Sequence, residues 1–420
     1  MTTSCSLSNK TYSLDNHGEI ELDIRFLHPL YEPEDLFTMA LRHNNSRRSF
    51  LFVSKILGKH IPITPCTLVE ATEHLSRLWL GEYFGSDVNT ISEPLLVIGF
   101  AETATAMGHA LFSHLEGNVS YLHSTREHSP DISPVLYACE SHSHATDHDF
   151  YLTDRKLITG AKHILVVDDE ITSGRTALEL IRAIDEQFPG KEYSVASFLD
   201  WRTKDNRNAF LAGINGREVK AVSLLRGEVV RNTLWSPSEK FLNSWNKNDN
   251  PISFKTIELP FTPSDYRNES DRFMAYSGRF GMGREDQEKL EREISSFGHE
   301  IRRNRDGGKT LFLGRGECMY IPLRLAMEAG ENVFFHATTR SPAWPSGKNA
   351  SYGIKNGISF EALDGSTYRE YVYNILDRSY DELFLVTENR CCPERLKTFM
   401  QFVEGAGIKN IKHVILGSGI

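Results

Sequence analysis

Short apolar runs that alternate with longer stretches of helical character are the feature that most constrains the fold of this chain. They begin near residue 94 with PLLVIGF, NVSYLHS, HILVVDD and YSVASFL, and they resume after Gly308 with TLFLG, NVFFHATTR, ELFLVTE and KHVILG. Runs of this kind are typical of strands buried on both faces, and helices between such strands produce parallel sheets. The sequence therefore predicts an α/β fold in both halves of the chain.

The length of 420 residues predicts more than one domain, because a typical domain holds about 150 residues. We expect a first domain over 20–240, a connector over 241–282 and a second, smaller α/β domain over 283–420. The connector is expected because Pro251, Pro260 and Pro263 occur there without any sustained periodicity. Beyond it, apolar residues at helical spacing predict an amphipathic helix that ends before Gly307: Leu290, Ile294, Phe297 and Ile301.

Composition and charge argue against several classes of protein. No apolar run approaches the roughly 18 residues of a membrane helix, and no signal-peptide pattern opens the chain, so we expect a cytoplasmic protein without a membrane anchor. The net charge of -9 argues against a nucleic-acid partner, because nucleic-acid binding requires a basic surface. The six cysteines include no C-x-x-C pair, which fits a reducing compartment and indicates no zinc site.

The two halves also match each other at several positions. Gly99 and Glu102 recur as Gly314 and Glu317, 215 positions later, and the strand runs that follow stay nearly in step. Such a repeat indicates a duplication. The alternative is the generic rhythm that all α/β units share. The other matched positions, at an offset of 214, are Asn118, Val119, Thr125 and Arg126 with Asn332, Val333, Thr339 and Arg340.

The segment HILVVDDEITSGRT, residues 163–176, carries the strongest chemical signal. An apolar strand ends in two acids, Asp168 and Asp169, and a turn rich in hydroxyls and glycine then opens a helix. Backbone N–H groups at a helix N-terminus bind anions, and two neighbouring carboxylates suit a diol. The segment therefore predicts a site for a phosphorylated sugar, with these turn residues on the phosphate: Thr172, Ser173, Gly174, Arg175 and Thr176.

This segment resembles the signature of type I phosphoribosyltransferases that binds 5-phosphoribosyl 1-pyrophosphate (PRPP). A receiver domain also ends a strand in paired acids, but it lacks the T-S-G-R-T loop. The resemblance implies a hooded phosphoribosyltransferase sheet in which Asp168 and Asp169 hold the ribose hydroxyls, together with Mg²⁺, and Arg126 meets the pyrophosphate. It also implies a pyrophosphate loop after the first core strand, formed by Gly99, Phe100, Ala101, Glu102 and Thr103.

The chain as a whole is similar to a bacterial group in which an orotate-phosphoribosyltransferase-like domain precedes a TRSP domain. The motif that gives this domain its name is Thr339–Pro342, within HATTRSPAWP. Members of the group occur in gene neighbourhoods associated with tellurium resistance. The basic segment 42–60 resembles a part of the group that would form the hood, and the alternative is a solvated basic rim. The basic side chains concerned are Arg47, Arg48, Lys55 and Lys59.

Two further segments have alternative interpretations. The loop ESHSHATDHDFY lies where the family keeps a mobile loop that closes over the substrate; a solvated loop and a metal site are the alternatives for its His142, His144 and His148. Asp200, Trp201 and Arg202 follow the last core strand. They are expected in a further active-site loop or in an ordinary surface turn.

The second unit lacks the phosphate loop, since Thr387 and Glu388 stand in place of the two aspartates and no T-S-G-x-T turn follows. We expect a degenerate copy that does not bind PRPP in the ordinary way. It binds a second anion, completes the first site across a pseudo-twofold axis, or replaces the subunit of a homodimer. The residues of its candidate ligand site are Gly314, Arg315, Gly316, Glu317 and Arg340.

The function expected from the sequence is transfer of ribose 5-phosphate from PRPP to a nucleobase-like nitrogen acceptor, with Mg²⁺ as cofactor. The product would be a nucleotide-like metabolite. The alternative is a non-catalytic regulator that binds PRPP. A hydrolase that uses Cys391 or Cys392 as nucleophile is a third reading, and no His or Asp at motif spacing supports it.

Overall fold

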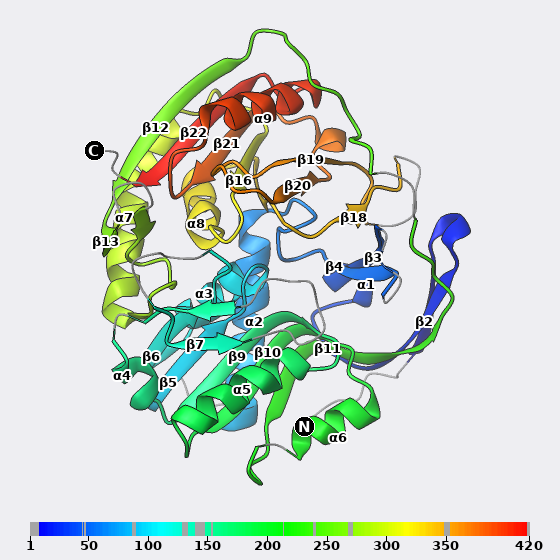
Figure 1. Ribbon diagram of the computed structural model, residues 1–420, viewed down its shortest axis with the longest axis vertical. Coiled ribbons are helices and arrows are strands. Elements are labelled where there is room, and N and C mark those ends of the chain that lie inside the picture. Colours follow the sequence, from blue (N-terminus) through cyan, green and yellow to red (C-terminus); the bar gives the residue numbers. More distant parts are fainter. Residues whose placement is uncertain are drawn as a thin grey trace.

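Two sheets, each parallel at its centre, lie at opposite ends of the structure in the computed structural model (Figure 1). The structure describes residues 8–43, 45, 48–85, 90–127, 133–138, 148–152, 154–212, 214–237, 241–267, 272–347 and 353–417. The first sheet has the order β1-β2-β11-β10-β9-β5-β6-β15. Its strands are β1 (Ser8–Ser13), β2 (Glu19–Leu27), β11 (Lys220–Asn232), β10 (Glu192–Asp200), β9 (His163–Ile171), β5 (Thr90–Gly99), β6 (Glu116–His123) and β15 (Met282–Gly283).

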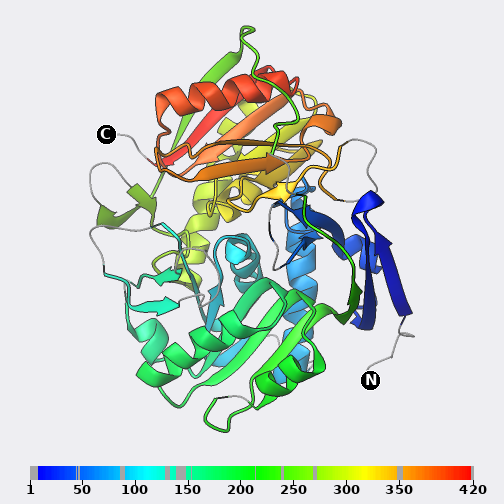
Figure 2. The ribbon, with the colours of Figure 1, turned by 45° about the vertical axis from the view of Figure 1, so that its right-hand side comes forward.

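The five central strands of this sheet, from β11 to β6, are parallel, as the apolar runs predict. Leu95–Ile98 in β5 and Ile164–Val167 in β9 are buried without interruption, because helices cover both faces. Helices α2 and α3 pack toward the second sheet, and α5 lies on the outer face (Figure 2). The helices of this unit are α1 (Pro33–Leu36), α2 (Pro65–Tyr83), α3 (Ala104–Ser113), α4 (Lys156–Thr159), α5 (Arg175–Gln187) and α6 (Lys204–Leu211).

A small antiparallel sheet forms the hood beside the first unit. It contains β3 (Phe37–Arg42) and β4 (Phe50–Ser54), so the apolar run at 50–53 is a strand. Its third strand, β18 (Ala343–Trp344), follows the TRSP motif and pairs with β3. Sequence patterns at 42–60 could not predict this partner, because it lies 300 residues further along the chain.

The second sheet has the order β12-β22-β21-β16-β17 and is parallel throughout. Its strands are β12 (Ser253–Phe261), β22 (Asn410–Gly417), β21 (Glu382–Thr387), β16 (Thr310–Gly314) and β17 (Val333–Ala337). Its helices are α7 (Arg284–Arg303), α8 (Tyr320–Glu328) and α9 (Pro393–Gly405). The amphipathic helix predicted beyond the connector is α7, with Leu290, Ile294 and Ile301 buried. No described helix is long and apolar enough to cross a membrane.

The segment expected as a connector contributes strands to both sheets. β12 is the edge strand of the second sheet, and β15 at 282–283 extends the first. Ile257, Leu259 and Phe261 alternate with exposed residues, which is a strand pattern, but Pro260 within it masks the alternation. Between them, β13 (Pro263–Arg267) and β14 (Arg272–Met274) form a hairpin.

The second unit repeats the topology of the first. In the first unit the second, first, third and fourth core strands lie in the order β6-β5-β9-β10, and their counterparts lie in the order β17-β16-β21-β22. Gly99 pairs with Val167, and Gly314 pairs with Val386 in the same register. Each unit also carries a hairpin after its second core strand: β7 (Leu136–Ala138) with β8 (His148–Phe150), and β19 (Gly357–Glu361) with β20 (Arg369–Tyr373).

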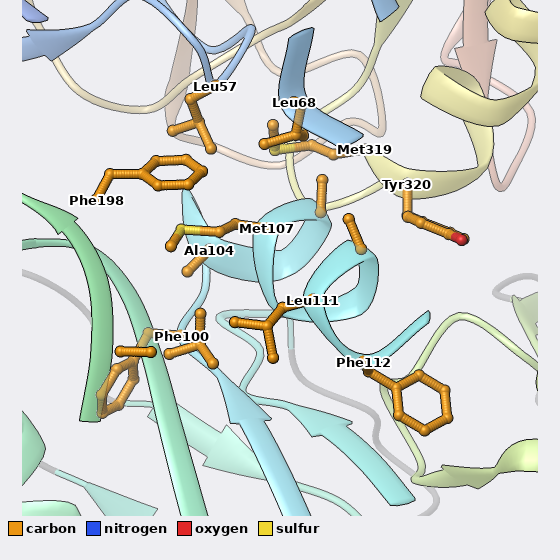
Figure 3. Packing of buried hydrophobic residues seen from close by; sticks show 14 of the residues in the cluster. Leu57, Leu68, Phe100, Ala104, Met107, Leu111, Phe112, Phe198, Met319 and Tyr320 are labelled. Carbon is orange, nitrogen blue, oxygen red and sulfur yellow. The ribbon is translucent and has the colours of Figure 1, made fainter. Parts of the chain in front are cut away.

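A continuous apolar core joins the two units. Met107 and Leu111 of α3, Leu68 of α2 and Leu57 of the hood segment belong to the same cluster as Met319 beside α8 (Figure 3). His109 of α3 also stacks on Tyr320, with ring centroids 3.7 Å apart. The two units therefore pack against each other through a shared apolar core rather than as independent domains.

Substitution of Gly58 tests the contact between the two units. It has a φ of +75°, and a Cβ there would lie 2.6 Å from Cδ1 of the buried Phe335 in β17. The control is Gly85, with a φ of +92° and no atom within 4 Å of a Cβ. We expect G58A to lower the free energy of unfolding by about 1–3 kcal/mol more than G85A, because overpacking adds to the same backbone strain. Denaturant unfolding of the full chain measures the difference; equal losses would contradict the contact.

Candidate functional site

Two carboxylates at the end of β9 form the centre of the site. Asp168 and Asp169 are half-buried at the carboxyl edge of the first sheet. The Thr103 hydroxyl donates a hydrogen bond to Oδ1 of Asp169 at 2.7 Å, and the Asp169 N–H donates to Oδ1 of Asp168 at 2.9 Å. Among the described residues, neither carboxylate forms an ion pair.

The electrostatics of these acids favour a cation. Burial raises the pKa of Asp168 well above its usual range, and the neighbouring charge of Asp169 raises it further. Burial also raises the pKa of Asp169. Two adjacent carboxylates without a cationic partner are the oxygen ligands that Mg²⁺ prefers when it also contacts substrate phosphates. The donor set therefore fits a magnesium ion.

The turn after β9 has the geometry of an anion site. Gly174 has a φ of +78° and precedes the first residue of α5, whose first N–H groups have no partner within the helix. A Cβ on Gly174 would lie 2.6 Å from Cε2 of the buried Phe210, so another residue there would strain the backbone and displace this ring. Thr172 and Arg175 are exposed, and Ser173 and Thr176 are partly exposed. The turn thus presents hydroxyls and a cation to solvent beside the two aspartates.

The loop after β5 lies directly beside these acids, because β5 and β9 are neighbours. The Phe100 N–H donates to the Val167 carbonyl at 3.1 Å, and the Ala101 N–H donates to the Ser124 hydroxyl at 2.8 Å. The Ala101–Glu102 peptide bond is cis. The structure therefore brings 99–103, 168–169 and 172–176 to one edge of the sheet.

The other predicted site residues do not share one location. Arg126 is partly exposed after β6. His148 is buried in β8, where its Nδ1 lies 2.9 Å from the Ser124 hydroxyl. His142 and His144 lie outside the described residues. Over the described part of the chain, no three His, Cys, Asp or Glu side chains are placed to share a metal ion.

Of the basic residues in the hood segment, Arg48 and Lys59 pair with acids at the carboxyl edge of the first sheet. Arg48 pairs with Glu170, the acid after Asp169, at 2.5 Å. Lys59 is fully buried and pairs with Glu102 at 2.5 Å, while its ammonium also donates to the Gly316 carbonyl at 2.8 Å. Lys55 is exposed, and Arg47 lies outside the described residues. Sequence analysis did not predict that Lys59 holds the loops of both units.

Asp200, Trp201 and Arg202 do not form a surface turn, since all three are buried. Arg202 pairs with Asp200 at 2.8 Å and lies 4.3 Å from the ring centre of Phe210, the residue that packs on Gly174. Trp201 stacks on Phe52 of the hood, with ring centroids 4.3 Å apart. This loop therefore supports the turn at Gly174 and links it to the hood.

Comparisons with known proteins decide the family. A model of the family described as phosphoribosyl transferase matches residues 36–228, and a model of the TRSP domain, which follows such domains, matches residues 276–403. The chain belongs to the phosphoribosyl transferases with a C-terminal TRSP domain. The first unit is therefore its phosphoribosyltransferase domain, and the second unit contains its TRSP domain.

Solved structures of phosphoribosyltransferases are also similar to this chain. Adenine phosphoribosyltransferase from Trypanosoma brucei is 10% identical with a TM-score of 0.29, covering 45% of this chain and 76% of that one. The enzyme from Rhodothermus marinus is 17% identical with a TM-score of 0.29, covering 45% and 93%. Hypoxanthine phosphoribosyltransferase from Staphylococcus aureus is 15% identical with a TM-score of 0.24, covering 40% and 79%. No curated protein matches the chain.

The loop of the TRSP domain copies that of the phosphoribosyltransferase domain. The Arg315 N–H donates to the Val386 carbonyl at 3.2 Å, and the Gly316 N–H donates to the Thr338 hydroxyl at 2.9 Å. These are the counterparts of the bonds made by Phe100 and Ala101. The polar side chains around the two loops, by contrast, differ between the two domains.

Internal partners occupy the corresponding site of the TRSP domain. Arg279 is only 1% exposed, and its guanidinium lies 2.8 Å from Glu317, 2.9 Å from Glu388 and 3.3 Å from Glu127. The cavity lined by Arg279, Glu317 and Glu388 has a volume of about 20 Å³, which is enough for about one water molecule. The charge of Glu388, the counterpart of Asp169, is therefore balanced by Arg279 of the protein itself.

The remaining cations of the expected second ligand site are paired as well. Arg315 lies 2.8 Å from Glu370 and 2.7 Å from Asp364. Arg340 stacks on the Tyr368 ring at 3.8 Å. The structure brings the five expected residues together, but Arg315 and Glu317 bind other side chains of the protein.

Cys391 lies 3.7 Å from Nε2 of His413, a contact that sequence spacing did not reveal. Burial raises the pKa of the thiol to about 12 and lowers that of His413 to about 4, so the pair holds a neutral thiol and a neutral imidazole. This geometry favours an inert Cys391.

Substitution of Arg279 tests whether its ion pairs with buried carboxylates stabilise the TRSP domain. Burial raises the pKa of Glu317, but the charge of Arg279, together with His123 and the hydrogen bonds from Thr125 and the Arg126 N–H, lowers this pKa to about 2. R279M leaves buried carboxylates without a cation, so we expect it to lower the free energy of unfolding by about 3–5 kcal/mol at pH 7.5.

The deficit of R279M should shrink as the pH falls toward 5. In the variant, the unpaired carboxylates have folded-state pKa values above their unfolded values, so proton uptake stabilises the folded state at lower pH. R292M, at an exposed position of α7, is the control. Denaturant unfolding at both pH values measures the effect, and a pH-independent deficit would contradict the assignment.

Proposed function

We propose that the phosphoribosyltransferase domain moves ribose 5-phosphate from PRPP to a nitrogen of a nucleobase-like acceptor and releases pyrophosphate. The observation that carries this proposal is the single edge where Asp168 and Asp169, the Gly174 turn and the 99–103 loop meet. These three elements offer partners for a diol, a phosphate and a pyrophosphate respectively. The product of such a transfer is a nucleotide-like metabolite.

The sugar end of PRPP binds between the aspartates and the turn. Asp168 and Asp169 accept hydrogen bonds from the two ribose hydroxyls. The 5′-phosphate lies on the N-terminus of α5, where backbone N–H groups and the positive end of the helix dipole bind anions. Hydroxyls of Thr172, Ser173 and Thr176 donate to the phosphate oxygens, and the Arg175 guanidinium adds charge.

The leaving group lies on the loop from Gly99 to Thr103, with Arg126 beside it. Mg²⁺, when bound, neutralises the pyrophosphate and makes it a better leaving group. As the bond from C1 to oxygen breaks, positive charge develops on the ribose. Asp168 and Asp169 lie at the same edge and stabilise that charge, so catalysis depends on positioning and electrostatics. The acceptor nitrogen then forms the new bond to C1.

The TRSP domain does not bind a second PRPP in this proposal, because Arg279 occupies the place of a sugar ligand. One PRPP per chain is therefore expected. The two domains together correspond to the two subunits of a dimer, with one working site.

The double variant D168N/D169N tests the proposal. Pyrophosphate release from PRPP and Mg²⁺ is measured with a panel of nucleobases, and PRPP binding is measured by calorimetry. We expect acceptor-dependent release by the natural chain, with one PRPP bound, and a loss of about a hundredfold or more in the variant.

D205N is the control, because Asp205 is exposed in the first turn of α6. Release that persists in the double variant would contradict the assigned site. PRPP binding without release for any acceptor would instead indicate a regulator that binds PRPP.

A further inference from the structure

The TRSP motif sits on the pyrophosphate loop of the other domain. The Arg340 N–H donates to Oε2 of Glu102 at 3.2 Å. The reciprocal bond runs from the Arg126 N–H to Oε1 of Glu317 at 2.7 Å. Arg126 and Arg340 are counterparts in the duplication, so the two bonds are related by a pseudo-twofold axis.

The next residue in each copy is Glu127 in one and Ser341 in the other. Their backbones are equivalent, because each N–H donates to the hydroxyl of the threonine two residues earlier: Glu127 to Thr125 at 3.0 Å and Ser341 to Thr339 at 3.1 Å. Each of these threonines also forms an antiparallel bridge to its hairpin. The positions of Glu127 and Ser341 therefore correspond in space as well as in sequence.

Glu127 reaches across the axis into the site of the TRSP domain. Its carboxylate lies 3.3 Å from Arg279, and Oε1 is 4.0 Å from the place of a Cβ on Gly316. Gly316 is the counterpart of Ala101. By the same symmetry, the backbone of Ser341 lies beside the 101–102 part of the pyrophosphate loop, next to the Arg340 N–H that donates to Glu102.

Ser341 is held firmly but keeps its hydroxyl available. The Tyr373 hydroxyl donates to the Ser341 carbonyl at 3.0 Å and accepts from the Ala343 N–H at 2.8 Å. β18 then fixes the segment against β3 of the hood (Figure 1). Ser341 is partly exposed, and its hydroxyl forms no hydrogen bond with the described residues.

We propose that the Ser341 hydroxyl of the TRSP motif donates a hydrogen bond to the pyrophosphate of PRPP bound in the phosphoribosyltransferase domain. The short neutral donor leaves room for an anion at the place where Glu127 fills and closes the other site. The TRSP domain thus completes the site as a second subunit would. This inference rests on the proposed function, since it names a further residue for the same ligand.

Binding of two ligands to S341E and S341A tests the inference. PRPP with Mg²⁺ carries the pyrophosphate, whereas ribose 5-phosphate lacks it. A carboxylate at 341 places like charge against pyrophosphate, so we expect S341E to weaken PRPP binding about a hundredfold or more. S341A loses one bond to a charged group, which predicts a loss of about tenfold, and S341T restores it. Ribose 5-phosphate should bind all variants within about twofold of the natural chain.

S296E is the matched control, because Ser296 is exposed on α7. Calorimetry measures both affinities, and thermal unfolding checks that each variant is folded; S341A and S341T decide the matter if S341E does not fold. Equal weakening of both ligands, or unchanged PRPP affinity in S341A, would overturn the role of Ser341. A natural chain that binds neither ligand would instead overturn the proposed function.

Discussion

The structure depends on one constraint: each unit begins its first core helix beside a buried glutamate that must find partners across the interface. Glu102 is 5% exposed and meets Lys59 and the Arg340 backbone; Glu317 is 5% exposed and meets Arg279 and the Arg126 backbone. A buried carboxylate is costly unless it is paired and hydrogen-bonded. Since each glutamate takes a backbone donor from the opposite unit, neither loop is satisfied alone. This requirement sets the two carboxyl edges face to face.

The cation that pairs with the buried glutamate differs between the two units. Arg279 neutralises Glu388 directly, whereas Lys59 of the hood segment pairs with Glu102 and leaves Asp168 and Asp169 without an ion pair among the described residues. Glu127 adds a carboxylate to the closed side, where burial raises its pKa to about 7 against the pull of Arg279. One site is therefore satisfied by the protein itself. The other keeps two acids without an ion pair among the described residues, and beside them an exposed turn at the N-terminus of α5, which is an arrangement that a phosphorylated ligand can use.

Much of the fold was predictable because the signals are local. The apolar runs marked the parallel strands, the spacing of Leu290, Ile294 and Ile301 marked α7, and the matched glycines and glutamates marked the repeat. The errors were also local in origin. Pro260 concealed the alternation of β12. For Asp200 and Arg202 the sequence left an active-site loop and a surface turn open, and the surface turn is wrong because the two residues pair with each other inside the protein. A charge that is satisfied by its neighbour can be buried, and composition does not record that pairing.

The sequence by itself determined the acids, the glycine turn and the helix that follows, because a strand, its terminal carboxylates and the next helix N-terminus are contiguous in the chain and need only local geometry. Only the tertiary structure showed how the site of the TRSP domain is closed. The ion pairs that close the TRSP side join Arg279 to Glu388 and Glu127, residues 109 and 152 positions away. Such pairs depend on how two sheets face each other, and Coulomb attraction acts on distance in space rather than along the chain.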